Sequence, residues 1–313
     1  MIVSLIGTLG AGLVVGGVGY LLDRFALGMI RPPYKPIRYR VSALPYLSES
    51  VSIKSGDQDL AGWIIRPEED RKGPVLVFVH GWGSNHGTMT RLAGPLLGMG
   101  FPALVFDVRH HGKSRGAPFV TARHFRDDIV AAVGLAGQRF PGRPLVLVGH
   151  SMGGSTGVLA VAHGAPVQAL ISIGAPADMW EVWAHHLNQQ GLPGTWVIKG
   201  LNPFWRFRAG VPWRSLDPRR KAGEIHGPFL VLHGAEDESV PVHHAFSLAE
   251  AGGVVPQVLP GEGHTDLLES PELHRIVVGF LAGLPQPSAP EARDEAHSGS
   301  TDGSMSNTDA PSV

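Results

Sequence analysis

The residues around Ser151 are the part of this sequence that most directly suggests chemistry. Ser151 is the centre of residues 149–153, GHSMG, which directly follow an apolar run ending at Val148. A G-x-S-x-G segment between a strand and a helix is typical of a sharp turn that lifts the serine hydroxyl clear of a sheet, and its glycines leave room for backbone passing close by. We therefore predict that Ser151 is a nucleophile.

A serine hydroxyl needs a general base, and the base needs an acid to orient it. His264 lies in the glycine-flanked segment PGEGHTDLL, and Asp237 lies in a turn after the apolar run 229–234. The order serine, aspartate, histidine suits a base at His264 held by Asp237. Asp178 also follows a predicted strand and is the alternative acid, although we favour Asp237.

The tetrahedral intermediate of acyl transfer needs two hydrogen-bond donors. The backbone N–H of Met152, next to the nucleophile, is one predicted donor. The second is the N–H of Trp82 in the segment HGWG, residues 80–83, which follows the apolar run 75–80. The alternative for HGWG is a plain turn in which Trp82 is only an apolar plug.

Short apolar runs alternate with longer segments of helical period, which predicts the elements that position these residues. An opening hairpin is expected from residues 50–67. The predicted strands are 75–80, 103–108, 145–150, 169–174, 229–234 and 254–259, and the predicted helices are 86–99, 121–140, 151–164, 241–251 and 268–282. Nearly continuous apolar strands separated by helices indicate a mostly parallel α/β sheet covered by helices on both faces. Ligands of such sheets bind beyond the carboxyl ends of the strands.

Residues 178–227 interrupt this alternation and contain five of the seven tryptophans. A structureless loop of that length is uncommon, so we predict an inserted helical cap over the strand ends. Trp180, Trp183 and Trp205 are the candidate substrate-binding residues of the cap. They could equally serve to pack the cap onto the sheet.

The two ends of the chain differ from the domain at 49–284. Residues 2–22 contain no charged side chain, and a helix of that length matches a bilayer's hydrocarbon core. We predict a transmembrane anchor at 1–24, a linker at 25–48 and a disordered polar tail at 285–313. Basic residues after the anchor indicate a single-pass membrane protein whose catalytic domain is cytoplasmic. Small residues repeat every four positions in the anchor and could pair two copies into a homodimer.

Composition excludes several other classes. With 26 basic and 27 acidic residues, the chain has no overall charge that would attract nucleic acid. It contains no cysteine, and none of its 16 histidines has the H-E-x-x-H spacing of a zinc site. We therefore expect no metal and no cofactor.

These motifs resemble, in the same order, those of the α/β-hydrolase superfamily, and within it the capped lysophospholipase-like and S33-aminopeptidase-like serine hydrolases. The similarity covers about residues 50–282 and includes HGWG, GHSMGG, HGAEDESVP and GEGH. The usual D-x-R-G-H-G-x-S segment is present at 107–114, but His110 replaces its first glycine, which bears on the shape of that loop. The resemblance implies ester, thioester or amide hydrolysis without a cofactor.

The resulting hypothesis is a membrane-tethered serine hydrolase that cleaves carboxylic esters, with an acyl lipid or lysophospholipid as substrate. One alternative is a peptidase or amidase, which usually needs a carboxylate in the cap to bind an amino terminus. The other is a non-catalytic scaffold that keeps the fold. Seven basic residues between 199 and 221 could contact anionic lipid, attract an anionic substrate or form a solvated face.

Overall fold

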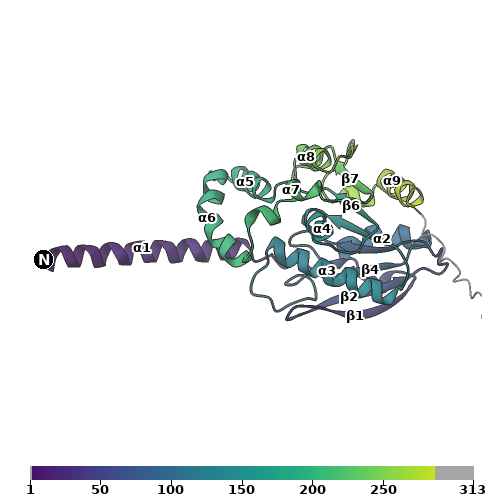
Figure 1. The fold of residues 1–313 in the computed structure, drawn as a ribbon, viewed down its shortest axis with the longest axis horizontal. Helices are drawn as coiled ribbons and strands as arrows, with labels where there is room; N and C mark the ends of the chain where they lie inside the picture. Colours follow the sequence, from purple (N-terminus) through teal and green to yellow (C-terminus); the bar gives the residue numbers. More distant parts are fainter. Residues whose placement is uncertain (1, 286–313) are drawn as a thin grey trace, which may run out of the picture.

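The computed structural model describes the backbone of residues 2–285 and the side chains of residues 14–285 except Trp213, so the predicted tail lies outside it from residue 286 onward. An eight-stranded sheet with the order β1-β2-β4-β3-β5-β6-β7-β8 forms its centre (Figure 1). The strands are β1 (Leu47–Ser55), β2 (Gln58–Arg66), β3 (Val75–Val79), β4 (Ala103–Phe106), β5 (Leu145–His150), β6 (Ala169–Ile173), β7 (Phe229–Gly234) and β8 (Gln257–Leu259).

The sheet is parallel from β4 to β8, and the hairpin β1–β2 pairs antiparallel with β4. The predicted α/β-hydrolase architecture is therefore confirmed. The strand predicted at 254–259 is shorter in the structure, because Pro256 has no N–H to donate and pairing begins only at Gln257.

Side chains of each central strand alternate between two cores on opposite faces of the sheet. Val77 of β3 packs in one core and Phe78 in the other, and both are fully buried. The first core lies under α3 (Ala122–Arg139), α4 (Met152–Ala162) and α8 (His243–Ala251), and the second lies under α2 (His86–Gly98) and α9 (Pro271–Ala282). Burial on both faces explains why these strands are apolar throughout.

The predicted cap segment contains α5 (Met179–Gln189), α6 (Gly194–Ala209), a short 3-10 helix η2 (Trp213–Leu216) and α7 (Pro218–Ala222). Helices α5 and α6 pack against each other, whereas α7 packs against α4 and α8 of the hydrolase body. The turn between α5 and α6 requires a glycine, because a Cβ on Gly194 would lie 2.1 Å from the Ala184 carbonyl oxygen. The part that covers the strand ends is therefore α5 and α6.

The N-terminal helix α1 (Ile2–Met29) projects from the domain, and its last turns pack against it (Figure 1). Ala26 and Leu27 pack against α6, and the indole N–H of Trp205 donates to the Ala26 carbonyl at 2.8 Å. The helix thus continues past the predicted anchor boundary at residue 24, because its end finds apolar surface on the cap.

The structure describes the side chains of α1 from Val14 onward. Within the described residues, no helix is long and apolar enough to cross a membrane. The described residues therefore do not support the transmembrane anchor, which stays a prediction.

Candidate active site

Ser151 lies in the turn between β5 and α4, with a backbone conformation that residues other than glycine seldom adopt. Its φ is 54° and its ψ is −125°, and its backbone N–H donates to the Ile173 carbonyl at 2.8 Å. Such a conformation costs on the order of 1–3 kcal/mol and is typical of functional sites. A Cβ on Gly149 or Gly153 would lie within 2.5 Å of backbone atoms, so the glycines of GHSMG are needed for the close approach.

His264 and Asp237 are brought together at the carboxyl edge of the sheet. His264 Nδ1 donates to Asp237 Oδ2 at 2.6 Å, while Asp237 Oδ1 accepts from the backbone N–H groups of Ser239 and Val240. Burial alone would raise the pKa of Asp237, but hydrogen bonds from His233 and His264 outweigh it and hold that pKa well below its usual range. Asp237 is therefore a fixed anion that sets the orientation of His264.

Asp178, the alternative acid, is engaged elsewhere. Its Oδ1 accepts from the backbone N–H of Trp180 at 2.9 Å and so caps the start of α5, and its Oδ2 pairs with Arg219 at 2.6 Å. Both interactions stabilise the cap. The geometry therefore favours Asp237 as the partner of His264.

Ser151 and His264 line one cleft of about 440 Å³ between the sheet and α5. No hydrogen bond joins the Ser151 hydroxyl to His264 within the described part of the chain. Catalytic hydrogen bonds are often long in free enzymes and shorten only when substrate binds.

His150 is a contributor that the sequence patterns do not identify. It is buried, its Nε2–H donates to the His264 carbonyl at 2.8 Å, and its ring lies 4.7 Å from the His264 ring. Burial first, and the neighbouring His264 second, lower the pKa of His150 to about 3, so it remains neutral at pH 7. This hydrogen bond fixes the backbone of His264, the predicted base. In the sequence, only the position of His150 next to Ser151 indicated this role.

The two predicted oxyanion donors both follow strands that end beside Ser151. Within the described residues, neither the N–H of Trp82 nor that of Met152 donates to a protein acceptor, so both remain available to an oxyanion. Gly81 is needed beside the nucleophile, because a Cβ there would lie 2.8 Å from the Cβ of Ser151. The Trp82 ring packs against Phe125 and Trp183, so its side chain is also a wall between sheet and cap.

The loop at 107–114 connects to the start of α2 through hydrogen bonds to Asp107. Asp107 is buried and accepts from the backbone and ring N–H of His86 and from the backbone of Lys113. His110, which replaces the usual glycine, has a φ of 61°, and a hydrogen bond from its Nδ1 to the Ala117 carbonyl offsets part of the strain. His110 therefore keeps the left-handed backbone that glycine favours, and it makes no hydrogen bond to Ser151, Asp237 or His264.

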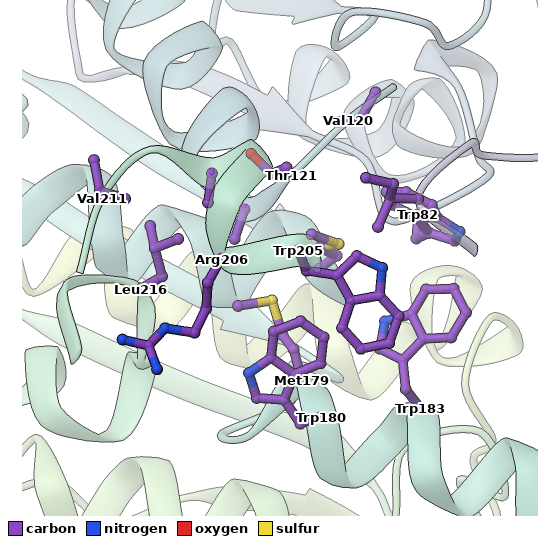
Figure 2. Close-up of a pocket in the computed structure, with 14 residues that line it drawn as sticks. Trp82, Val120, Thr121, Met179, Trp180, Trp183, Trp205, Arg206, Val211 and Leu216 are labelled. Atoms are coloured by element: carbon purple, nitrogen blue, oxygen red, sulfur yellow. The ribbon is translucent and has the colours of Figure 1, made fainter. Parts of the chain in front are cut away.

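A second, apolar pocket adjoins the catalytic cleft beneath the cap. Figure 2 shows the indoles of Trp180, Trp183 and Trp205 gathered there, and the rings of Trp180 and Trp205 stack at 4.7 Å. The pocket and the cleft share four lining residues, which are Trp82, Met152, Met179 and Trp183. The three candidate cap tryptophans therefore both pack the cap and line a cavity.

Residues from the N-terminal segment also line these cavities. Ile30 lines the apolar pocket, and Pro33 and Lys35 line the catalytic cleft. The sequence predicted a linker here and offered no motif that assigns it to the site, because its contacts are made only with segments far away in the chain.

Three side chains that join α5 to α8 could hold a metal ion. They are Glu181, His243 and His244, and His243 Nε2 lies 2.9 Å from a Glu181 carboxylate oxygen. None of the three lines the catalytic cleft. An ion there would therefore bear on the position of the cap and not directly on a reacting ester.

Four of the seven basic residues at 199–221 pair with carboxylates among the described residues, and one of them is Arg220, which pairs with Asp217. Arg208 pairs with Asp23, Arg219 with Asp178, and Lys221 with Glu224. The carboxylates of Asp23, Asp178 and Glu224, which lie outside residues 199–221, therefore offset part of the positive charge of that segment.

The chain resembles known proteins in sequence and in fold. A family model described as serine aminopeptidase, S33, matches residues 70–209. An uncharacterised protein of Bacillus subtilis is 26% identical over 196 residues, which are 61% of this chain and 64% of that protein, so the chain spans a little under two thirds of that relative. The monoacylglycerol lipase of Mycolicibacterium smegmatis is 25% identical over 242 residues, which are 66% of this chain and 85% of that protein.

An esterase of Pyrococcus furiosus has the same fold, with a TM-score of 0.66 and 22% identity over 82% of this chain and 98% of that one. The chain therefore has the α/β-hydrolase fold, and its residues 70–209 resemble the serine aminopeptidase family. The proteins that it resembles include an esterase and a monoacylglycerol lipase.

Proposed function

We propose that the protein is a serine esterase that cleaves acyl esters at the cleft between the cap and the sheet. The observation that supports this most strongly is the apolar pocket of the cap, which adjoins the cleft containing Ser151 and His264. An apolar pocket beside a nucleophile suits an acyl chain, because burying its methylenes contributes about 0.8 kcal/mol each. The open space in that pocket is about 70 Å³, which suits a short acyl chain, so a longer chain requires the indoles to move apart.

In the proposed mechanism, the Ser151 hydroxyl attacks the ester carbonyl while His264 Nε2 takes its proton. Asp237 stabilises the imidazolium, and the N–H groups of Trp82 and Met152 stabilise the oxyanion. The alcohol then leaves with the proton of His264. Water hydrolyses the acyl-enzyme by the same steps in reverse, which releases the acid and restores Ser151.

Charge in the cleft argues against an aminopeptidase. No carboxylate is among the described residues that line the cleft, whereas Lys35 is. The four cap acids are engaged in caps or ion pairs: Asp178 and Asp217 cap helices, Glu181 pairs with His243, and Glu224 pairs with Lys221. A positively charged amino terminus would therefore lack a partner and would be repelled by Lys35.

Membrane tethering through α1, with the catalytic domain in the cytoplasm, is part of the proposal. The apolar sequence of residues 2–22 and the exposed apolar side chains at Val14, Val15 and Leu21 support it. Extraction of the full chain from membranes by carbonate and by detergent tests it. A protein that carbonate releases would overturn the anchor and leave the esterase proposal intact.

The esterase proposal is tested on the full chain in detergent, because Ile30, Pro33 and Lys35 line the cavities. Aryl esters of increasing acyl-chain length and a panel of aminoacyl amides are compared, with Ser151→Ala as the matched control. We expect ester turnover that exceeds amide turnover and disappears in the control. Amide turnover above ester turnover would support the peptidase, and a folded protein that turns over neither and ignores a fluorophosphonate would be a scaffold.

A further inference from the structure

A third cavity, about 440 Å³ in volume, lies next to the catalytic cleft and differs from the apolar pocket in chemistry. Its lining comes from the linker, the start of α2 and Thr265, and it comprises Lys35, Pro36, Arg38, Tyr39, Ser84, Asn85, Gly87, Thr88, Arg91 and Thr265. We call it the basic pocket.

The basic pocket and the apolar pocket each adjoin the catalytic cleft through different residues. The basic pocket shares Lys35 with the cleft, and its Thr265 is the neighbour of His264. It shares no lining residue with the apolar pocket. An ester whose acyl chain enters the apolar pocket would therefore direct its alcohol part toward the basic pocket.

Three cations and no carboxylate line the basic pocket. Arg91 is paired with Glu269 and stacks over the Tyr39 ring at 4.9 Å. Lys35 and Arg38 pair with no carboxylate in the part of the chain that the structure describes. A positive charge without a counter-ion beside a cavity favours an anionic ligand.

The linker is fixed in place at this cavity. The side-chain amide of Asn85, which is buried, donates to the Lys35 carbonyl at 3.1 Å. The first amides of α2 are already satisfied, since those of His86 and Gly87 donate to carboxylate and amide oxygens. Ser84 and Thr88 form one hydroxyl–hydroxyl hydrogen bond, which leaves one hydroxyl proton for a ligand. The available donors are therefore side chains.

We propose that the basic pocket binds the phosphate group of the substrate's alcohol part, so that the substrate is an acyl ester of a phosphorylated small alcohol, as in a lysophospholipid. This inference rests on the proposed esterase function. Lysine and arginine together suit phosphate, because lysine supplies a point charge and arginine donates two parallel hydrogen bonds to phosphate oxygens. Cleavage breaks the ester C–O bond, transfers the acyl group to Ser151 and returns the proton of His264 to the alcohol. The phosphate ester itself is untouched.

The first test compares two substrates with the same acyl chain, a monoacylglycerol and its 3-phosphate, on the full chain in detergent. We expect kcat/KM to be about tenfold higher for the phosphate, a preference that weakens with salt. Arg38→Gln should lower the ratio of the two kcat/KM values toward one. Arg40→Gln removes the same charge from the same linker outside the basic pocket and should leave the ratio unchanged. Equal kcat/KM values in the unmodified protein, or an equal effect of both variants, would overturn the proposal while the esterase stands.

The second test measures binding without turnover. Calorimetry of the Ser151→Ala protein with glycerol 3-phosphate should show binding that Arg38→Gln weakens. Binding of inorganic phosphate as tight as that of glycerol 3-phosphate would identify a free-phosphate site and overturn the substrate assignment. Arg38-dependent binding of glycerol 3-phosphate in a protein that hydrolyses no ester would instead remove the esterase proposal and retain the anion site.

Discussion

Replacing Asp237 by asparagine tests whether this carboxylate is the partner of His264. In the structure, Asp237 Oδ2 accepts from His264 Nδ1 at 2.6 Å. An asparagine has the same shape but can turn its NH₂ toward the ring, which favours the imidazole tautomer whose Nε2 already bears a proton. That tautomer cannot accept the proton of Ser151.

The expected loss of kcat follows from two roles of Asp237 that asparagine cannot fill. Asp237 fixes the tautomer of His264, and it stabilises the imidazolium that forms during the reaction. A chymotrypsin-type triad loses about 10⁴-fold in kcat when its aspartate becomes asparagine, which corresponds to about 5.5 kcal/mol of transition-state stabilisation. We expect a loss of the same order here, because Asp237 makes the same contact with the base.

Asp178→Asn is the matched control, because it makes the same chemical change at the alternative acid. Asp178 caps α5 and pairs with Arg219. Asparagine keeps the cap and loses only this partly exposed ion pair, so the substitution should cost about 0.2–1 kcal/mol of stability and little activity. Stopped-flow and steady-state hydrolysis of a short aryl ester measure kcat, and urea unfolding measures stability. A loss of activity in Asp178→Asn that equals or exceeds the loss in Asp237→Asn would refute the assignment.

Three further predictions concern packing and titration. Gly112→Ala should lower the free energy of unfolding by about 3 kcal/mol or more, since its Cβ would lie 2.2 Å from an Asp107 carboxylate oxygen at a φ of 46°; a loss below about 1 kcal/mol in urea would contradict this. Ile30→Trp should narrow the apolar pocket, so that kcat/KM falls for long-chain aryl esters and changes least for the acetate; an unchanged chain-length profile would count against the pocket. Burial first, and a neighbouring imidazole second, lower the pKa values of His111 and His150 to about 3. Below about pH 6.5 the unfolded chain protonates these histidines and the folded protein does not, so the free energy of unfolding falls from pH 6.5 toward pH 3. The expected loss is about 2 kcal/mol per histidine at pH 5. Equal free energies of unfolding in urea at pH 7 and pH 5 would contradict this prediction.

Sequence alone determined the features that depend on residues close together in the chain. The apolar strands of the core and the glycines around Ser151 are local patterns, and each reflects a local requirement. A strand buried on both faces must be apolar throughout, and a position where neighbouring backbone passes too close for a Cβ must be glycine. Such requirements are visible without knowing what packs against the element.

Tertiary structure decided the features that depend on contacts between distant segments. Sequence order could not separate Asp237 from Asp178, since both follow strands, and only the 2.6 Å contact with His264 distinguishes them. The placement of Ile30 and Lys35 beside the cavities was equally hidden, because these residues form part of a wall only when α1 and the linker pack against α6 and α2. Side chains that meet across a fold leave no spacing in the sequence, and so only the packed structure identifies them.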